Sequence, residues 1–379
     1  MPGYELLGEE EKKEINEVFD KGAILYRNEG YKVKEFEQAF CKELDSKYAL
    51  GVTSGTAALR IALAALNIGE GDEVITQSFT FVATVEAIVE SRATPICIDI
   101  DNTLNLNPNI LEQSITSRTK AVIVVHMLGV PADLLKIQEI CKKHNLFLIE
   151  DTAWGCGGKM NGKSLGTFGD FGAFSFDYAK TMTTGEGGML ISNNSEIFNK
   201  AKAWHDHGHE NNPLLPRWED SRSSSGFNYR MMELQGAIGL AQLKKLKNII
   251  NLQRKNCKIL WDSIKDLEGI EKRKMPADSY ETADALIFFV KDKNVALKCR
   301  EELLKEDIGT KILPEAYTWH FAGTWIHIKE LVKGSEGKLE NNLEKSKSLL
   351  SRAVSLPISI KLNENIPKKL RSAIQRALS

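Results

Sequence analysis

Between residues 48 and 149, short apolar runs alternate with amphipathic stretches of helical period. The apolar runs predict buried strands, which we place at residues 48–52, 74–76, 96–100, 121–125 and 146–149. The stretches between them predict helices, at the Ala- and Leu-rich segment 57–66 and at residues 82–90, 109–115 and 133–144. Strands that alternate with helices are typical of an α/β fold with a doubly wound, mostly parallel sheet that is covered on both faces.

A strand–loop–strand pattern follows this alternation. Two apolar runs, at residues 172–176 and 188–191, suit buried strands. The polar segment between them holds one lysine, Lys180, followed by the sequence TMTTGEGG. We therefore expect Lys180 to lie on a loop between two strands of the sheet.

The segments that flank the sheet predict helices and a smaller second domain. The expected helices outside the sheet cover residues 7–21, 33–44, 195–209, 232 to about 267, 295–306 and 341–351, with a basic helix at the C-terminus. A strand-like run, ETADALIFFV, lies in the C-terminal third, and a polar, serine-rich loop covers residues 217–225. We predict a large sheet domain over residues 1–250 and a small C-terminal α+β domain over residues 251–379. About the first 25 residues are expected to pack with the small domain.

Composition narrows the class of protein without indicating a function. The chain has 379 residues, 42% of them hydrophobic, and a formal net charge of -1 from 50 basic and 51 acidic residues. Such a balance does not suggest a nucleic-acid surface. The six cysteines form no CxxC pair, no secretory leader opens the chain, and the longest apolar run is too short to span a bilayer. These features predict a cytoplasmic protein that binds neither nucleic acid nor a membrane.

Three alternating histidines end the helical stretch at residues 195–209. His205, His207 and His209 lie beside two acidic residues, which raises the question of a metal site. A zinc-type site needs three or four ligands that converge on one point. Neither the spacing nor a set of cysteines indicates such convergence. We therefore expect a polar or substrate-facing loop here, and no metal.

The turn TSGT leads into the Ala- and Leu-rich helix and is a candidate phosphate site. Ser54 suits the N-cap position, which leaves the first free amides near Gly55 and Thr56. Free N–H groups and the positive end of the helix dipole together attract a phosphate. Many capped helices bind nothing, so a plain helix cap remains the alternative.

Candidate chemical groups recur beyond the predicted strand ends, where ligands of doubly wound sheets bind. Ser54, Phe81, His126 and Asp151 all lie at such positions. Burial of Lys180 between strands would favour its neutral amine, the form that attacks a carbonyl to make a Schiff base. The alternatives are ordinary ones: an exposed loop lysine, an aspartate that caps the next segment, and a core phenylalanine.

Together these groups match what pyridoxal phosphate requires of a protein. The cofactor needs a lysine for its aldehyde, a seat for its phosphate and an acid for its pyridine nitrogen. Lys180, the start of the helix after Ser54, and Asp151 would supply the three. A carboxylate at Asp151 would keep the ring nitrogen protonated, and Phe81 could stack on the ring.

The chain resembles the sugar aminotransferases of the DegT/DnrJ/EryC1/StrS family, which have the fold type I architecture. The resemblance covers nearly the whole chain, and its most specific segments are TSGTAALRIAL, GDEVITQSFTFVAT, IEDTAWGCGG, GDFGAFSFDYAKTMTTGEGGML and GFNYRMMELQGAIGLAQL. It implies a pyridoxal phosphate-dependent transaminase. The fold that it implies is a large domain with a doubly wound, mostly parallel sheet and a smaller C-terminal α+β domain.

The same resemblance implies a role for individual residues. Lys180 would form the Schiff base and shuttle protons, and Asp151 would pair with the pyridine nitrogen. The other implied cofactor contacts are the amides of Gly55 and Thr56 and the hydroxyl of Ser175 at the phosphate, Phe81 and Ala153 on the two ring faces, and Asn228, which in the family reaches the phosphate of the neighbouring subunit. A homodimer with two shared active sites is therefore implied.

Two positions depart from the family pattern. Trp154 stands where the family has Gln or His in contact with the cofactor's ring hydroxyl, and an indole can donate only from its N–H. Asp177 stands near a position where histidine is frequent, so we give it no catalytic role. The retained Lys180 argues against the family's dehydratases, which have histidine in its place.

The resemblance also implies a class of substrate. The opening MPGYELLGEEEKK, the segment HDHGHE and the late TWHFAGTWIHIKEL are most similar to the branch that installs the 8-amino group of an amino-octulosonate, a lipopolysaccharide sugar. Tyr317, Trp319 and His320 would then line the substrate side. We predict transfer of an amino group, with L-glutamate as donor, to an oxidised sugar such as 8-oxo-3-deoxy-octulosonate. The alternatives are a nucleotide-linked keto-sugar as acceptor, or a non-catalytic regulatory protein that keeps the fold.

Overall fold

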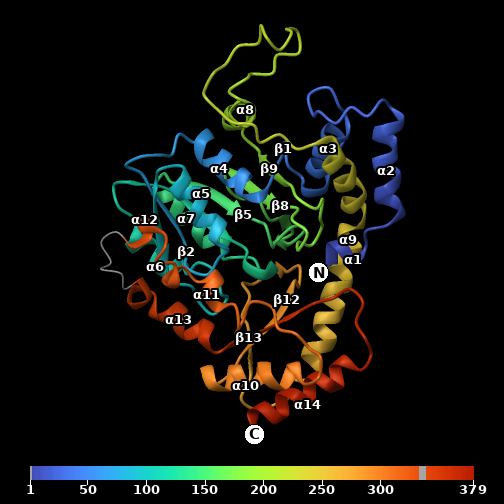
Figure 1. The fold of residues 1–379 in the computed structure, drawn as a ribbon. Helices are drawn as coiled ribbons and strands as arrows, with labels where there is room; N and C mark the ends of the chain where they lie inside the picture. The colour runs from blue at the N-terminus through green and yellow to red at the C-terminus, as the bar shows by residue number, and fades with distance from the viewer. Residues whose placement is uncertain (1, 333–338) are drawn as a thin grey trace.

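The computed structural model describes residues 2–332 and 339–379, and its largest element is a seven-stranded sheet (Figure 1). In spatial order the strands are β1 (Tyr48–Val52), β9 (Gly188–Ser192), β8 (Phe171–Ser175), β5 (Phe147–Asp151), β4 (Thr119–Val125), β2 (Glu73–Gln77) and β3 (Thr94–Ile98). Only β9 runs against its neighbours in this sheet. The predicted doubly wound, mostly parallel sheet is confirmed.

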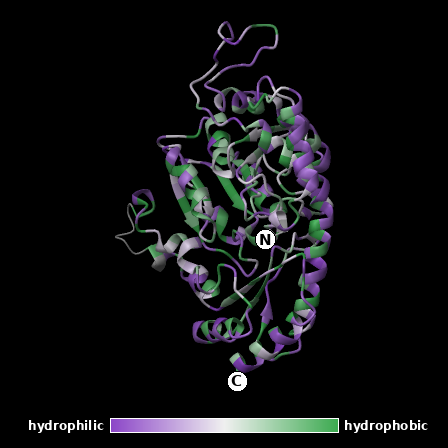
Figure 2. Ribbon diagram, turned by 45° about the vertical axis from the view of Figure 1, so that its right-hand side comes forward, coloured by the Kyte–Doolittle hydropathy of each residue, from purple (hydrophilic) through white to green (hydrophobic). Residues whose placement is uncertain are grey.

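Helices cover both faces of this sheet, which explains why its strands are continuously apolar. One face carries α4 (Gly55–Ala65), α5 (Val82–Glu90) and α8 (Ser195–Trp204), and the other carries α3 (Lys32–Leu44), α7 (Leu134–Lys143) and α9 (Glu233–Asp262). Within β4, Ala121 and Ile123 join the core under α4, whereas Val122 and Val124 join the core under α7. This is the alternation of side chains that a strand imposes. Figure 2 shows the hydrophobic strands inside the more polar outer helices.

A second, antiparallel sheet organises the C-terminal part of the chain. Its order is β10 (Glu271–Lys272), β12 (Ala285–Phe289) and β13 (Ala353–Pro357), and α10 (Lys293–Leu304) and α14 (Ile366–Leu378) pack beside it (Figure 1). The 30-residue helix α9 connects the two parts, with Ala237 and Leu243 buried near its start and Cys257 and Leu260 in the C-terminal core. An α+β arrangement of this part agrees with the predicted fold class.

The N-terminal segment packs along α9. Helix α2 (Glu9–Asp20) is held there by Glu11, whose carboxylate accepts hydrogen bonds from Gln242 at 2.8 Å and from Lys245 at 2.8 Å. Nearer the start of the chain, Glu5 accepts a hydrogen bond of 2.7 Å from the hydroxyl of Ser359. The segment therefore contacts α9 before residue 250 and also touches the C-terminal part.

Several predicted elements end earlier than the sequence pattern suggested. The helix predicted at 195–209 ends at Trp204, because His207 and Gly208 both adopt positive φ angles, of 56° and 83°, which a right-handed helix excludes. The helix predicted at 109–115 is a short α-helix, α6 (Pro108–Leu111), followed by a 3-10 turn. The long helix predicted to reach about residue 267 ends at Asp262.

Other elements were not predicted at all. Three two-residue strands form a small sheet, in the order β11 (Ser279–Tyr280), β6 (Lys159–Met160) and β7 (Lys163–Ser164). Strands this short leave no periodic pattern in a sequence. The unpredicted short helices are α1 (Pro2–Glu5), α11 (Tyr317–His320) and α12 (Lys329–Val332), whereas α13 (Glu344–Ser351) confirms the helix predicted at residues 341–351.

The part of the chain that the structure describes contains neither a membrane-spanning helix nor a cluster of metal-ligating side chains. No helix in residues 2–332 and 339–379 is long and apolar enough to cross a membrane. Within the same ranges no three His, Cys, Asp or Glu side chains gather closely enough to hold a metal ion. All six cysteines are free thiols.

Candidate active site

A cavity of about 740 Å³ lies at the carboxyl ends of the parallel strands and holds most of the predicted site residues. Because β9 is the only strand of the large sheet that runs the other way, the ends of β1, β5 and β8 meet at one edge. Asp151 and Ser175 are the last residues of β5 and β8. The predicted residues that line the cavity are Gly55, Thr56, Phe81, Asp151, Ala153, Ser175, Lys180, Trp319 and His320.

The start of α4 forms one end of the cavity. The hydroxyl of Ser54 accepts a 3.0 Å hydrogen bond from the amide of Ala57, which confirms the predicted N-cap. The first amides of a helix have no acceptor within it, and Gly55 and Thr56, the first two residues of α4, line the cavity. A Cβ on Gly55 would come within 2.9 Å of the Cβ of Ser175, so glycine lets β8 approach the helix start. The amides, the helix dipole and the nearby hydroxyl of Ser175 suit a phosphate group.

Asp151 supplies a buried acid at the cavity wall. Its carboxylate accepts hydrogen bonds from the hydroxyl of Thr84 at 2.8 Å and from the amide of Ala153 at 3.2 Å. Burial raises the pKa of this carboxyl, and the bonds from Thr84 and Ala153 oppose that rise. A buried carboxylate of this kind is stabilised by a cationic partner in the cavity, such as a protonated ring nitrogen.

Lys180 lies on the loop between β8 and β9, as the sequence predicts. The loop turns at Asp177, whose carbonyl accepts from the amide of Lys180 at 3.0 Å and whose carboxylate accepts from the amide of Ala179 at 2.9 Å. Burial lowers the pKa of the Lys180 ammonium to about 8, against the opposing effects of Asp151 and Asp284. The neutral, nucleophilic amine is therefore far better populated than at an exposed lysine.

That pKa leads to a prediction for the protein without cofactor. At pH 7 an amine with a pKa of about 8 is about one tenth neutral, whereas an ordinary lysine is neutral to about 0.04%. Neutral amine rises with pH, so acetylation of Lys180 by trace acetic anhydride should increase with a midpoint near pH 8. The measurement is competitive labelling followed by mass spectrometry, with surface lysines of the same digest as internal references. A midpoint at or above pH 10 would contradict the shift.

Two lysine ammonium groups lie over the ring of Trp154 at the cavity wall. The Nζ atom of Lys180 is 3.4 Å from the centroid of its ring, and the Nζ atom of Lys311 is 4.8 Å from it. The indole thus presents its π face to both ammonium groups, an attractive cation–π arrangement. Thr282 holds the backbone here through a 3.2 Å hydrogen bond from its hydroxyl to the carbonyl of Trp154.

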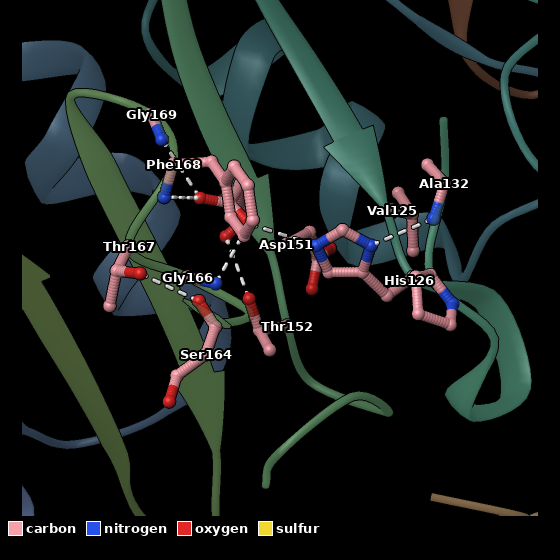
Figure 3. A network of polar contacts seen from close by, with 12 residues as sticks. Val125, His126, Ala132, Asp151, Thr152, Ser164, Gly166, Thr167, Phe168 and Gly169 are labelled. Atoms are coloured by element: carbon pink, nitrogen blue, oxygen red, sulfur yellow. Dashed lines mark hydrogen bonds and ion pairs between the residues drawn. The ribbon is translucent and has the colours of Figure 1, made fainter. Parts of the chain in front are cut away.

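His126, which the sequence places beyond a strand end, belongs to a buried network of polar contacts (Figure 3) and does not line the cavity. Its Nδ1 accepts from the amide of Ala132 at 3.1 Å, so the proton is on Nε2, which donates to Glu150 at 3.1 Å. The same carboxylate accepts from the amides of Gly166 at 2.7 Å and Phe168 at 2.6 Å. Glu150 precedes Asp151 on β5 and points to the other face of the sheet.

We expect Glu150→Gln to lower the free energy of unfolding by about 2–4 kcal/mol, because its new NH₂ group would face backbone donors that a carboxylate now accepts from. Glu150 is fully buried. Urea unfolding is the measurement, and Glu139→Gln, at an exposed position on α7, is the matched control. Equal stability of the two variants would show that the network contributes little.

The structure does not bring two of the predicted residues to this cavity. Tyr317 packs against Phe321, with ring centroids 5.2 Å apart, and lines a separate cavity of about 710 Å³. It begins α11, so Trp319 and His320 face the candidate site from the other side of that short helix. Asn228 is exposed and bridges to the backbone of Asp206, outside the cavity. Its contact with a neighbouring subunit therefore remains a prediction.

The segment with alternating histidines has a structural explanation. Asp206 is fully buried and accepts two hydrogen bonds from Arg217, at 2.8 and 2.6 Å, and a further one from Arg230. His209 contacts Asp220 at 3.1 Å, and His205 contacts the carbonyl of Lys202. The contacts of Asp206 with Arg217 and of His209 with Asp220 thus tie the loop at residues 210–225 to the segment that follows α8.

Sequence reasoning missed two groups at the site. Thr84, which donates to Asp151, is a polar residue on the apolar face of α5. A polar side chain at such a position could have indicated from the sequence that it has a buried hydrogen-bond partner. Lys311 lines the cavity and forms a 2.6 Å ion pair with Asp284. Nothing in the local sequence connects two residues so far apart, so this pair could only be found in three dimensions.

Comparison with known proteins gives three kinds of match. The model of the DegT/DnrJ/EryC1/StrS aminotransferase family matches residues 5–375. GDP-perosamine synthase of Escherichia coli O157:H7 is 40% identical over 263 residues, which cover 69% of this chain and 70% of that protein.

Solved structures agree over almost the whole length. An aminotransferase from Psychrobacter cryohalolentis is 29% identical and superimposes with a TM-score of 0.88, over 98% of this chain and 97% of its own. The E. coli GDP-4-keto-6-deoxy-D-mannose-3-dehydratase with bound hydrated PLP is 26% identical, with a TM-score of 0.84 over 97% of both chains.

Proposed function

The chain belongs to the DegT/DnrJ/EryC1/StrS aminotransferase family, and we propose that this pyridoxal phosphate-dependent enzyme transfers the amino group of L-glutamate to the carbonyl carbon of a sugar. One observation carries the proposal: Lys180 and Asp151 line a single cavity together with the start of α4. These are the amine, the acid and the phosphate seat that the cofactor requires.

The residues of the cavity fit the cofactor group by group. The amides of Gly55 and Thr56 and the hydroxyl of Ser175 would hold the phosphate, in a space that a side chain at residue 55 would close. Asp151, whose carboxyl is buried on the cavity wall, would keep a proton on the pyridine nitrogen. Phe81 and Ala153 would contact the two ring faces.

Pyridoxal phosphate, when bound, supplies a carbonyl for the incoming amine and a ring that accepts electrons. Lys180 would do the acid–base work: its Nζ atom, with a pKa near 8, removes and returns the proton at the amino-bearing carbon of the substrate. Trp154 and the small C-terminal part of the chain would keep water away from that atom.

The acceptor that we propose first is 8-oxo-3-deoxy-octulosonate, a precursor in lipopolysaccharide sugar synthesis. Its support is the resemblance of the chain's opening, its HDHGHE segment and its TWHFAGTWIHIKEL segment to that branch, together with the position of Trp319 and His320 on the cavity. A nucleotide-linked keto-sugar is the second candidate, supported by the 40% identity to GDP-perosamine synthase.

A homodimer with shared active sites is part of the same proposal. The loop at residues 210–225 projects from the body of the protein (Figure 1) and carries two apolar side chains, Leu214 and Trp218, that are 88% and 85% exposed. Such exposure is typical of a surface that another molecule covers. Asn228, at the base of this loop, would then approach the phosphate of the partner subunit.

The test is a two-step experiment on the purified holoenzyme. Addition of L-glutamate should convert bound pyridoxal phosphate to the amine form, seen as loss of its visible absorbance. Each acceptor is then added in turn, and mass spectrometry identifies the sugar that gains an amine while the absorbance returns. Absence of the first step would favour the non-catalytic alternative, and product from only the nucleotide-linked sugar would replace our first acceptor.

A further inference from the structure

We propose that Lys311 binds a carboxylate of the amino donor. This carboxylate is the one bonded to the carbon from which Lys180 removes a proton. Lys311 is only 6% exposed, yet it lines the same cavity as Lys180. The inference rests on the proposed transamination, because it assigns the subsite for one of its two substrates. Nothing in the catalytic scheme described above uses this lysine.

The hydrogen bonding of Lys311 leaves donors for a ligand. Within residues 2–332 and 339–379, its Nζ atom donates one hydrogen bond to an oxygen atom, that of Asp284 at 2.6 Å. An ammonium group carries three N–H donors, and buried donors are nearly always paired. The face of Trp154, 4.8 Å away, attracts the charge without accepting a conventional hydrogen bond.

The position of Lys311 relative to Lys180 fits an amino acid. Both ammonium groups contact the same indole ring of Trp154, at 3.4 and 4.8 Å from its centroid. In an amino acid the carboxylate is bonded directly to the carbon that loses its proton, so a cation close to the proton-removing amine is where that carboxylate would lie. An octulosonate differs, since its carboxylate is at the far end of the molecule from the carbon that receives the amine.

The energetics also favour a functional role for this ion pair. Lys311 and Asp284 are 5% and 1% exposed in their side chains, and a buried ion pair contributes little net stability compared with apolar packing. Asp284 lies outside the cavity lining, so it balances the charge of Lys311 without blocking the cavity side. Backbone contacts fix the lysine, whose amide donates to the carbonyl of Ser355 at 2.8 Å. The result is a preorganised cation in a substrate cavity.

The first experiment measures binding of glutarate, a dicarboxylate that cannot be transaminated, to the holoenzyme by calorimetry. Lys311→Gln should raise the Kd for glutarate by about 10- to 100-fold, the effect of losing a charged hydrogen bond. Lys311→Arg should retain most of the affinity, and Lys298→Gln, at an exposed position on α10, should leave it unchanged. Because no turnover is needed, this result stands apart from the proposed function.

Two further variants separate a binding role from a structural one. Asp284→Asn removes the negative charge beside Lys311 and should leave glutarate binding equal or tighter. If Lys311→Gln alone folds poorly because it strands Asp284, the double variant Lys311→Gln/Asp284→Asn removes both charges and keeps an amide pair in their place. The double variant should fold and still lose glutarate affinity.

The affinity of these variants for glutarate decides whether Lys311 binds the donor carboxylate. Glutarate binding within twofold of wild type in folded Lys311→Gln or in the double variant would overturn it. It would also be overturned if these variants lost cofactor occupancy while the loaded fraction bound glutarate normally, since Lys311 would then serve the cofactor. If glutarate affinity falls and the apparent affinity for L-glutamate in the first half-reaction falls in parallel, the carboxylate is that of the donor.

Discussion

Lys180→Ala is expected to reduce the rate of the L-glutamate half-reaction by at least about 10²- to 10⁴-fold, the usual contribution of a positioned proton-transfer group. The alanine removes the only lysine of the loop between β8 and β9, and with it the amine whose pKa burial lowers to about 8. Other cavity lysines do not replace it, because Lys311 is held by Asp284. The measurement is the single-turnover loss of visible absorbance on mixing with L-glutamate.

The control for that result is Lys142→Ala, which removes an exposed lysine on α7 and should react as the wild type does. A small exogenous amine such as methylamine should restore part of the rate to Lys180→Ala, since it can enter the space of the missing side chain. Rescue would distinguish a lost proton carrier from a damaged fold. An unimpaired Lys180→Ala variant would remove the basis of the proposed transamination.

The location of the site could be predicted because it follows from the architecture. The apolar runs predicted the strands of the large sheet, and parallel strands bring their carboxyl ends to one edge. Asp151 and Ser175 end β5 and β8 there, and Ser54 follows the end of β1. Their convergence depends only on strand direction, which the alternation of helices and strands already indicates.

What could not be predicted depends on contacts between distant segments. Lys311 and Asp284 are ordinary residues in their own sequence contexts, and only the fold brings them to Lys180 and Trp154. The end of the helix predicted at 195–209 was missed for a related reason: Asp206, just after it, pairs with Arg217 and Arg230, which lie further along the chain. Local periodicity contains no information about such partners.

Two adjacent acidic residues on β5 have different roles: one belongs to a buried structural network, and the other lines the candidate active site. Glu150 faces the network with His126 and the amides around residues 166–169, where every bond is internal to the protein. Asp151 faces the cavity, where Thr84 and Ala153 orient it and burial raises its pKa. The pleat of the strand alone separates the two roles, because successive side chains point to opposite faces.

Asp151→Asn is therefore expected to slow the L-glutamate half-reaction by about 10²- to 10⁴-fold, since leaving a buried charge without its partner costs ~3–5 kcal/mol. The amide oxygen can still accept from Ala153, and the NH₂ group can donate to the hydroxyl of Thr84, so the fold should be kept. It would not stabilise a proton on the ring nitrogen, and a neutral ring would be a weaker acceptor of electrons. Stopped-flow absorbance on the loaded variant measures the rate, and Asp20→Asn, an exposed change on α2, is the control. A wild-type rate in Asp151→Asn at full cofactor occupancy would exclude Asp151 as the partner of that nitrogen.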